Sequence, residues 1–323
     1  MTLSRREFNK GLLVSLPLLN SWPAFGASAK FSSRIRGVQI AAITYCYRDM
    51  REPKVPWSPA KVDQMMDQLV QAYIEDQINV AEFWIGYIEP VAFNPLAPGS
   101  PKIREQLREW RLSRPLDIFD RARKKFDDAS IEIYSCMYNF DDKITDEEIE
   151  MGFEMAKALK TNIVSAGCTL PSIKRVAPFA EKHKMRVGVH TENPFNDPHP
   201  ETDGMGVTAN ILSAMKLSPY VNVTLDVGHY TAAGGDPVAF IKAHHDRIVA
   251  LHIQDRFKND ARPHDYQNDL EWGKAQTPIK EILQLMKQEK YTFPAIIEYN
   301  YGGKGTPVEE VRKCYEYAKA ALA

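Results

Sequence analysis

The sequence predicts an α/β fold, a single-domain (β/α)8 TIM barrel that follows an N-terminal signal peptide. Three observations predict it. Eight β-rich runs alternate with amphipathic helical segments along the chain. Several of these runs are short and continuously apolar, as parallel strands buried on both faces are. Removal of residues 1–29 would leave 294 residues, an ordinary length for one barrel.

The eight predicted strands are bounded by polar or turn-forming residues. In chain order they are Gly37–Thr44, Asn79–Trp84, Ile131–Met137, Asn162–Ala166, Met185–Glu192, Val221–Asp226, Ile248–Ile253 and Phe293–Glu298. Eight alternations without a composition break favour one closed barrel over residues 30–323, with no second domain.

The helices carry recognisable start signals. Ser58 before Pro59 predicts an N-cap with proline in the first turn, and Thr306 before Pro307 opens the last helix in the same way. Thr145 with a glutamate three residues later predicts a capping box. Residues 87–113 read as a long insertion after the second strand, on the side where barrel active sites form.

The N-terminus predicts export. Residues 4–10, SRREFNK, place Arg5 and Arg6 ahead of Phe8 and Lys10, and an apolar run too short to span a bilayer follows. The ASA motif at 27–29 supplies a small-x-small cleavage site. We expect a twin-arginine signal peptide over 1–29, the twin-arginine export machinery as a partner and a periplasmic protein. The alternatives are a basic helix start or a signal for the other secretion route.

Composition narrows the class further. Residues 1–29 hold three of the 41 basic and one of the 42 acidic residues, so the remainder carries a net charge of −3. This balance argues against a nucleic-acid partner, and no later apolar run predicts a stable membrane anchor. The cysteines are far apart and form no C-x-x-C motif; we expect those in strand-like runs to be buried: Cys136 and Cys168.

Four consecutive predicted strands finish on carboxylates or imidazoles. The fifth ends on His190 and Glu192, the sixth on Asp226, the seventh on His252 and the eighth on Glu298. Catalytic groups gather at the carboxyl ends of barrel strands. Mixed oxygen and imidazole ligation suits one divalent metal ion, and the pattern leaves Mn²⁺, Mg²⁺, Co²⁺ and Zn²⁺ open.

The motifs LDVGHY, RIVALHIQDR, EWG at 271–273 and FPAIIEYNY resemble the xylose-isomerase-like TIM-barrel family of sugar (phosphate) isomerases and epimerases. The resemblance runs from residue 37 to the C-terminus and is most specific in the last four strands. It implies a metal held by Asp226, His252, Glu298 and a strand-five residue, either Glu192 or His190. Glu192 is the preferred ligand because it is nearer the strand end.

The resemblance also implies substrate contacts. His229 matches the substrate-contacting histidine of the D-x-G-H motif, and Arg256 matches the basic residue after the strand-seven motif. Glu82 matches an acidic residue that often ends strand two. His190, if it is not the ligand, is a further substrate contact. Gln254 stands where relatives commonly carry lysine, which indicates a substrate without phosphate.

For several other aromatic and histidine residues, the position in the sequence alone suggests where the side chain lies. Trp84, Tyr45 and Phe83 form an apolar wall for a sugar or pack in the core. We expect His183 to be exposed, and His199 and His264 to lie in long loops on the catalytic side.

Taken with the resemblance, the site predicts a metal-dependent sugar isomerase or epimerase that works through an enediolate on an unphosphorylated keto-sugar. Glu192 and Glu298 would move the proton, while His229 and Arg256 hold hydroxyls. The alternatives are a 3-keto-glycoside lyase or hydratase with the same metal site, and a non-catalytic periplasmic sugar-binding protein. The sequence leaves the sugar, the metal and the oligomeric state open, a homo-oligomer included.

Overall fold

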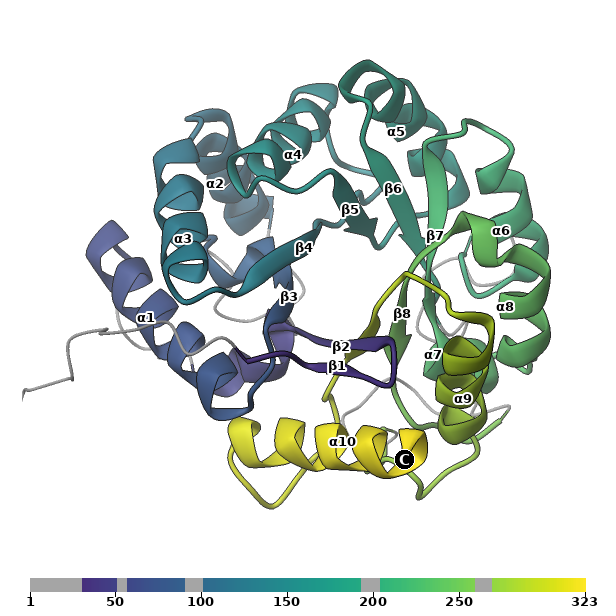
Figure 1. The fold of residues 1–323 in the computed structure, drawn as a ribbon. Coiled ribbons are helices and arrows are strands. Elements are labelled where there is room, and N and C mark those ends of the chain that lie inside the picture. Colours follow the sequence, from purple (N-terminus) through teal and green to yellow (C-terminus); the bar gives the residue numbers. More distant parts are fainter. Residues whose placement is uncertain (1–30, 51–56, 91–100, 193–203, 259–268) are drawn as a thin grey trace, which may run out of the picture.

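The computed structural model describes residues 31–50, 57–90, 101–192, 204–258 and 269–323. Within these residues nine strands follow one another in chain order in a single sheet, and β2 also pairs with β9. That pairing closes the sheet into a barrel of eight parallel strands, with the helices in a ring around it (Figure 1). The predicted (β/α)8 TIM barrel is confirmed.

Each barrel strand lies within the corresponding predicted run. The strands are β2 (Val38–Ile43), β3 (Val80–Trp84), β4 (Glu132–Met137), β5 (Ile163–Ala166), β6 (Arg186–His190), β7 (Val221–Asp226), β8 (Ile248–Ile253) and β9 (Ala295–Ile297). The sequence did not predict β1 (Arg34–Ile35), which pairs antiparallel with the start of β2. Arg36 and Gly37 make that tight turn with φ of 50° and 93°, which glycine adopts without strain.

The helices are α1 (Pro59–Glu75), α2 (Pro101–Leu112), α3 (Leu116–Asp128), α4 (Asp146–Ala158), α5 (Leu170–His183), α6 (Thr208–Met215), α7 (Val227–Ala232), α8 (Pro237–His244), α9 (Ile279–Glu289) and α10 (Pro307–Leu322). The predicted caps are confirmed: Ser58 accepts from the backbone of α1, and Thr145 and Thr306 form capping boxes with Glu148 and Glu309.

The predicted insertion at 87–113 contains helix α2, which the sequence did not predict. Arg104 of α2 forms a two-bond ion pair with the fully buried Glu148 of α4, at 2.7 and 2.8 Å. Arg111 lies 2.7 Å from Glu89 and 3.2 Å from the same Glu148. Because these charges are buried and paired, they fix α2 against α4 rather than leaving the insertion a loop.

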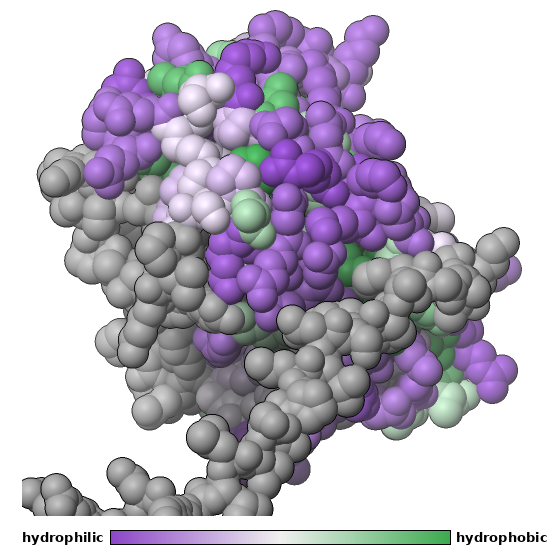
Figure 2. Space-filling view, turned by 90° about the vertical axis from the view of Figure 1, so that its left-hand side faces the viewer, coloured by the Kyte–Doolittle hydropathy of each residue, from purple (hydrophilic) through white to green (hydrophobic). Residues whose placement is uncertain are grey.

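The described surface on one side of the barrel is mainly polar (Figure 2). Figure 2 shows the side of the molecule on the left of Figure 1, where α1, α2 and α3 lie, as a hydrophilic surface with small separate hydrophobic areas. No described helix combines the length and apolar character needed to cross a membrane. Cys46, Cys136 and Cys314 are buried, and Cys168 is partly exposed, which differs from its predicted burial.

Candidate metal centre

The candidate ligands lie at the carboxyl ends of four neighbouring strands. Asp226 of β7 is the register partner of His252 of β8, and His252 is in turn the partner of Ile296 of β9. His190 ends β6, and Glu298 follows the last residue of β9. All four positions lie at the carboxyl ends of their strands, where the barrel architecture gathers functional groups.

Four of these side chains form one buried cluster. His190, Asp226, His252 and Glu298 each offer a ligand atom, and these atoms lie within 4.8 Å of one another. His190 Nε2 is 3.1 Å from His252 Nδ1 and 3.8 Å from both Asp226 Oδ2 and Glu298 Oε2. His252 Nδ1 is 2.6 Å from Glu298 Oε2. Two imidazoles and two carboxylates at these separations can surround one divalent ion.

The structure itself supports a cation at this position. Oδ1 of Asp226 accepts from the backbone N–H of His229 at 2.8 Å, but Oδ2 is buried and accepts no hydrogen bond from the residues that the structure describes. A buried carboxylate oxygen without a partner is costly. Because Oδ2 faces the histidines of the cluster, a metal ion would satisfy it, so the residues present fit the ion that the fold family implies.

His252 is held between two carboxylates. Its Nε2 donates to Glu82 Oε1 at 2.7 Å, on the side opposite its contact with Glu298. Burial acts to lower the pKa of His252, but the charges of Glu82 and Glu298 outweigh it and raise that pKa well above its ordinary value. Burial acts to raise the pKa of Glu298, but His252 and His190 lower it well below the usual range.

Asp226 experiences the opposite balance. Burial, reinforced by the nearby charge of Glu298, raises the pKa of its carboxyl. A positive charge among these side chains would oppose that shift of the pKa, because it would favour the ionised carboxylate. The electrostatics of Asp226 therefore agree with the unpartnered Oδ2 in favouring a cation.

Glu82 lies beneath the cluster inside the barrel. Its side chain is fully buried, and Oε2 accepts from Ser135 Oγ at 2.7 Å and from Ser165 Oγ at 2.5 Å. With Oε1 engaged by His252, both oxygens of the carboxylate have protein partners. This geometry therefore favours contacts of Glu82 with the protein over the predicted contact with a substrate.

The structure separates the two strand-five residues. His190 is buried in the cluster, whereas the Glu192 side chain is 41% exposed and has Oε1 3.9 Å from His190 Nδ1. Strand β6 ends at His190, and the Glu192 side chain, two residues later, is not part of the buried cluster. The geometry favours His190 over Glu192 as the candidate ligand at the end of β6, which is the fifth strand of the barrel.

The two predicted substrate contacts after β7 and β8 lie together. Nη1 of Arg256 is 3.1 Å from His229 Nδ1 and 3.2 Å from Asp269 Oδ1. Arg256 is fully buried, and its Nε and Nη2 have no hydrogen-bond partner among the described residues. Gln254 is 2% exposed, and within the same part of the chain neither atom of its amide has a hydrogen-bond partner. These donors and acceptors near the ends of β7 and β8 are available to a polar ligand.

The three aromatic residues of the predicted wall differ in position. Phe83 is fully buried and packs edge-on against Phe126 of α3, so it belongs to the core. Tyr45 and Trp84 are partly exposed and form an edge-to-face pair with centroids 5.0 Å apart. Only these two can face a ligand at the mouth of the barrel.

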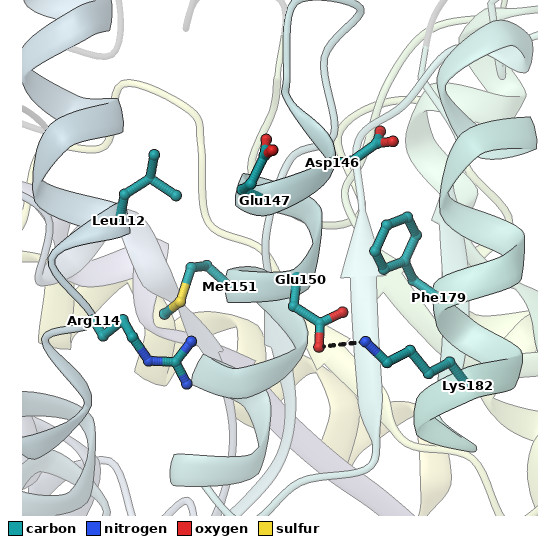
Figure 3. Close-up of a pocket in the computed structure, with 8 residues that line it drawn as sticks. All are labelled: Leu112, Arg114, Asp146, Glu147, Glu150, Met151, Phe179 and Lys182. Atoms are coloured by element: carbon teal, nitrogen blue, oxygen red, sulfur yellow. Dashed lines mark hydrogen bonds and ion pairs between the residues drawn. The ribbon is translucent and has the colours of Figure 1, made fainter.

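A second group of acidic and histidine residues lies on the outside of the barrel. An open hollow of about 400 Å³ is lined by residues of α4 and α5, by the last residue of α2 and by the segment that follows it: Leu112, Arg114, Asp146, Glu147, Glu150, Met151, Phe179 and Lys182 (Figure 3). Glu150 and Glu154 lie beside His183 there. Lysines already neutralise both carboxylates at 2.8 Å, which makes this group an ion-pair network.

The expectation that His183 is exposed was wrong. Its side chain is 4% exposed because the imidazole stacks on Phe153 of α4 with ring centroids 5.0 Å apart. The charged helix face that suggested exposure instead surrounds the ring with ion pairs. His199 and His264 lie outside the described residues, as do residues 1–30.

Sequence reasoning missed three polar residues around the site. Ser135 and Ser165 interrupt the apolar runs of β4 and β5 at inward-facing positions, and that interruption is the signal that could have identified them. Asp269, which pairs with Arg256, lies in a segment without a recognisable pattern, so no signal pointed to it.

Residues 168–320 match the family model described as xylose isomerase-like TIM barrel. The resemblance to this family is supported. The matched segment contains all four residues of the buried cluster and the His229–Arg256 pair, whereas Glu82 lies before it. A comparison with curated proteins found no match.

Solved structures share the xylose isomerase-like barrel over most of their length. The probable 3-DHS dehydratase AsbF from Bacillus anthracis aligns with a TM-score of 0.58 at 15% identity, over 86% of this chain and 98% of its own. The 3-keto-D-glucoside 4-epimerase YcjR from E. coli gives 0.56 at 10%, over 88% and 99%. The IOLI protein, solved with a zinc atom, gives 0.57 at 12%, over 88% and 97%. At these identities the likeness concerns the fold.

Proposed function

We propose that this protein is a divalent-metal-dependent isomerase or epimerase of an unphosphorylated keto-sugar. The observation that carries the proposal is the buried cluster of His190, Asp226, His252 and Glu298, in which Asp226 Oδ2 accepts no hydrogen bond from the described residues. These four residues would hold the ion, with His190 in place of the Glu192 that the sequence favoured. When bound, the ion supplies Lewis acidity toward a sugar carbonyl and its neighbouring hydroxyl.

The protein residues supply the proton transfers. Glu298 Oε2 lies 3.8 Å from Nε2 of His190, and Glu192 Oε1 lies 3.9 Å from Nδ1 of the same ring. The two carboxylates therefore lie toward opposite nitrogens of one imidazole. One takes the carbon-bound proton beside the carbonyl to give an enediolate, and the other returns a proton to the opposite face or the adjacent carbon.

The binding groups are those near the ends of β7 and β8. His229 and Arg256 hold hydroxyls of the sugar, and the amide of Gln254 both donates to and accepts from a hydroxyl. A neutral amide suits a neutral polyol better than a phosphate ester. The structural similarity to YcjR, a 3-keto-D-glucoside 4-epimerase, supports 3-keto-glucosides as the first compounds to test.

Reaction in heavy water tests the proposal. The purified protein with added Mn²⁺ is incubated with 3-keto-glucosides, free ketoses, aldoses and phosphorylated sugars, and products are followed by mass and by NMR. We expect deuterium at the carbon beside the carbonyl with no other change in mass. Glu298→Gln should abolish the exchange, because it removes a proton-transferring carboxylate. Glu316→Gln, at an exposed position of α10, is the matched control.

The same experiment separates the alternatives. A lyase would expel the group on the carbon adjacent to the enediolate with its bonding electrons, leaving an enone that absorbs in the ultraviolet. A hydratase would add water to that enone. Saturable sugar binding without deuterium exchange across the panel would contradict turnover and indicate a sugar-binding protein. A preference for phosphorylated sugars would contradict the assigned substrate class.

The proposal includes export through the twin-arginine route to the periplasm. Its support is the SRREFNK motif with Arg5 and Arg6, followed by an apolar run and the ASA motif. Replacement of both arginines by lysine should strand the precursor in the cytoplasm, as fractionation and N-terminal sequencing would show. Normal periplasmic levels of the double-lysine variant would contradict this route.

A further inference from the structure

A layer of polar side chains crosses the barrel directly below the cluster. Glu82 of β3 occupies its centre and receives hydrogen bonds from β4, β5 and β8, through Ser135, Ser165 and His252. Ser165 Oγ also lies 2.9 Å from Thr224 Oγ1 of β7. Four strands besides β3 therefore contribute to the position of one fully buried carboxylate.

In this layer, polar side chains occupy barrel positions that apolar side chains would otherwise fill. A Cβ atom at Gly188 of β6 would lie 2.3 Å from Thr224 Oγ1, so glycine leaves the room that the threonine needs. Burying a carboxylate in a barrel interior costs several kcal/mol unless it has partners. Glu82 receives three hydrogen bonds that offset this cost, and both of its oxygens are engaged by the protein rather than left open to a substrate.

We propose that Glu82 is a positioning residue that fixes His252 with Nδ1 toward the cluster and Nε2–H toward the barrel interior. The inference rests on the metal site of the proposed function. Neutral imidazole carries its proton on one nitrogen and its lone pair on the other. Glu82 and Glu298 can both only accept, so without an ion His252 donates from both nitrogens. A cation held by Glu298 and His190 would displace the proton on Nδ1, and the Glu82 carboxylate would retain the proton on Nε2, so that the lone pair of Nδ1 faces the cluster.

The hydroxyls of Ser135 and Ser165 complete the arrangement. Both bind Oε2, so the carboxylate cannot rotate away and Oε1 stays aligned with the imidazole. A charged acceptor behind a ligand histidine also raises the electron density on the ligating nitrogen. Glu82 therefore acts on orientation, on tautomer and on ligand strength through His252, without touching the ion or the substrate.

The test measures Co²⁺ binding to the full protein rather than turnover. Glu82→Gln keeps the size and one acceptor but removes the charge. We expect the Co²⁺ dissociation constant to rise about 10–100-fold, as for loss of similar outer carboxylates, with a changed visible absorption spectrum. Asp76→Asn is the control for loss of a buried carboxylate elsewhere and should leave both unchanged. A Glu82→Gln protein that is folded by circular dichroism and binds Co²⁺ within twofold of the wild type would overturn the proposal.

A second variant covers the case in which Glu82→Gln does not fold. The Ser135→Ala, Ser165→Ala pair keeps the carboxylate but removes its two hydroxyl donors, and we expect weaker Co²⁺ binding in the same direction. An unchanged dissociation constant in that folded protein would overturn the proposal. Nitrogen NMR of the Zn²⁺ form adds a direct readout: His252 should carry its proton on Nε2, and a proton on Nδ1 would contradict the assigned role.

Failure of this inference is distinguishable from failure of the proposed function. If the wild-type protein binds Co²⁺ but exchanges no sugar proton, and Glu82→Gln binds Co²⁺ more weakly, the proposed function fails and the role of Glu82 stands. If sugars react while Glu82→Gln binds Co²⁺ normally, the role of Glu82 alone fails. If the wild type binds no Co²⁺, both fail.

Discussion

Asp226 Oδ1 accepts a hydrogen bond from the backbone N–H of His229 at 2.8 Å, so one carboxylate both caps helix α7 and presents Oδ2 to the buried cluster. Asp226 is the N-cap residue of that helix, and His229 lies in its first turn. The cap fixes the carboxylate orientation that directs Oδ2 toward His190. Asp226 therefore combines a structural role as a helix cap with the ligand role that we propose.

Two substitutions at Asp226 separate these roles. Asp226→Asn keeps a capping oxygen but loses the charge, so we expect loss of stoichiometric Mn²⁺ binding with little loss of stability in the metal-free protein. Asp226→Ala should lose the metal and also about 1 kcal/mol of unfolding free energy, because the cap is gone. Metal titration and urea unfolding in chelator measure the two effects. Full metal content in Asp226→Asn would contradict the ligand assignment.

The strands and most of the cluster could be predicted because both depend on local patterns. Apolar runs that end on Asp226, His252 and Glu298 place polar groups at the carboxyl ends of strands, and parallel pairing brings those ends together. The role of Glu82 could not be predicted in this way. Its partner His252 lies 170 residues away in the chain, and only the curvature of the closed barrel brings them within 2.7 Å.

The choice between His190 and Glu192 depended on where one strand ends. The sequence places the polar end of the run at Glu192, but the strand stops at His190, which pairs with Thr224 of β7. Pattern alone does not determine a strand end to within two residues, and here two residues separate a buried side chain from a half-exposed one. Helix α2 was missed for another reason: its contact with the barrel is made by Arg104 and Arg111, which pair with acidic side chains, rather than by an apolar stripe.

Metal affinity distinguishes the two strand-end residues. His190→Gln should weaken Co²⁺ binding by more than about tenfold, because it removes an imidazole ligand from the cluster. Glu192→Gln should leave Co²⁺ binding near the wild-type value and lower kcat by about 10²–10⁴-fold, the usual contribution of a proton-transferring group. Competition with a chelating dye measures the first effect. The reverse pattern would make Glu192 the ligand, as the sequence alone suggested.

The substrate preference should depend on Gln254. Its Cβ lies against Gly228, two residues past the ligand position of β7, and its amide has no protein partner among the described residues. Gln254→Lys places a cation there, and we expect KM for phosphorylated sugars to fall about 10–100-fold, as a charged hydrogen bond would provide. Gln254→Met is the control, since it removes both polar atoms without adding charge. No gain for phosphate esters in the lysine variant would place Gln254 outside the binding site.

Stability should change with pH through a carboxyl far from the cluster. Asp76 at the end of α1 is 2% exposed, accepts from Tyr47 Oη at 2.8 Å and lies 3.5 Å from Arg312. Burial raises the pKa of Asp76 to about 7, although the Tyr47 hydrogen bond and Arg312 act to lower it. The folded protein therefore holds a proton on Asp76 between about pH 4 and 7 that the unfolded chain has released.

The sign of the effect follows from that raised pKa. The stability that protonated Asp76 contributes is fully present below about pH 4 and is lost as the pH rises through about 7, at up to about 1.4 kcal/mol for each pKa unit. Asp76→Asn mimics the protonated form and keeps an acceptor for Tyr47. Its unfolding free energy, measured with urea in chelator, should exceed that of the wild type by more at pH 8 than at pH 5. Asp67→Asn, at a half-exposed position of α1, should show no such trend. An Asp76→Asn advantage that stays constant or shrinks with rising pH would contradict the shifted pKa, because the two proteins differ only in whether this buried group can ionise.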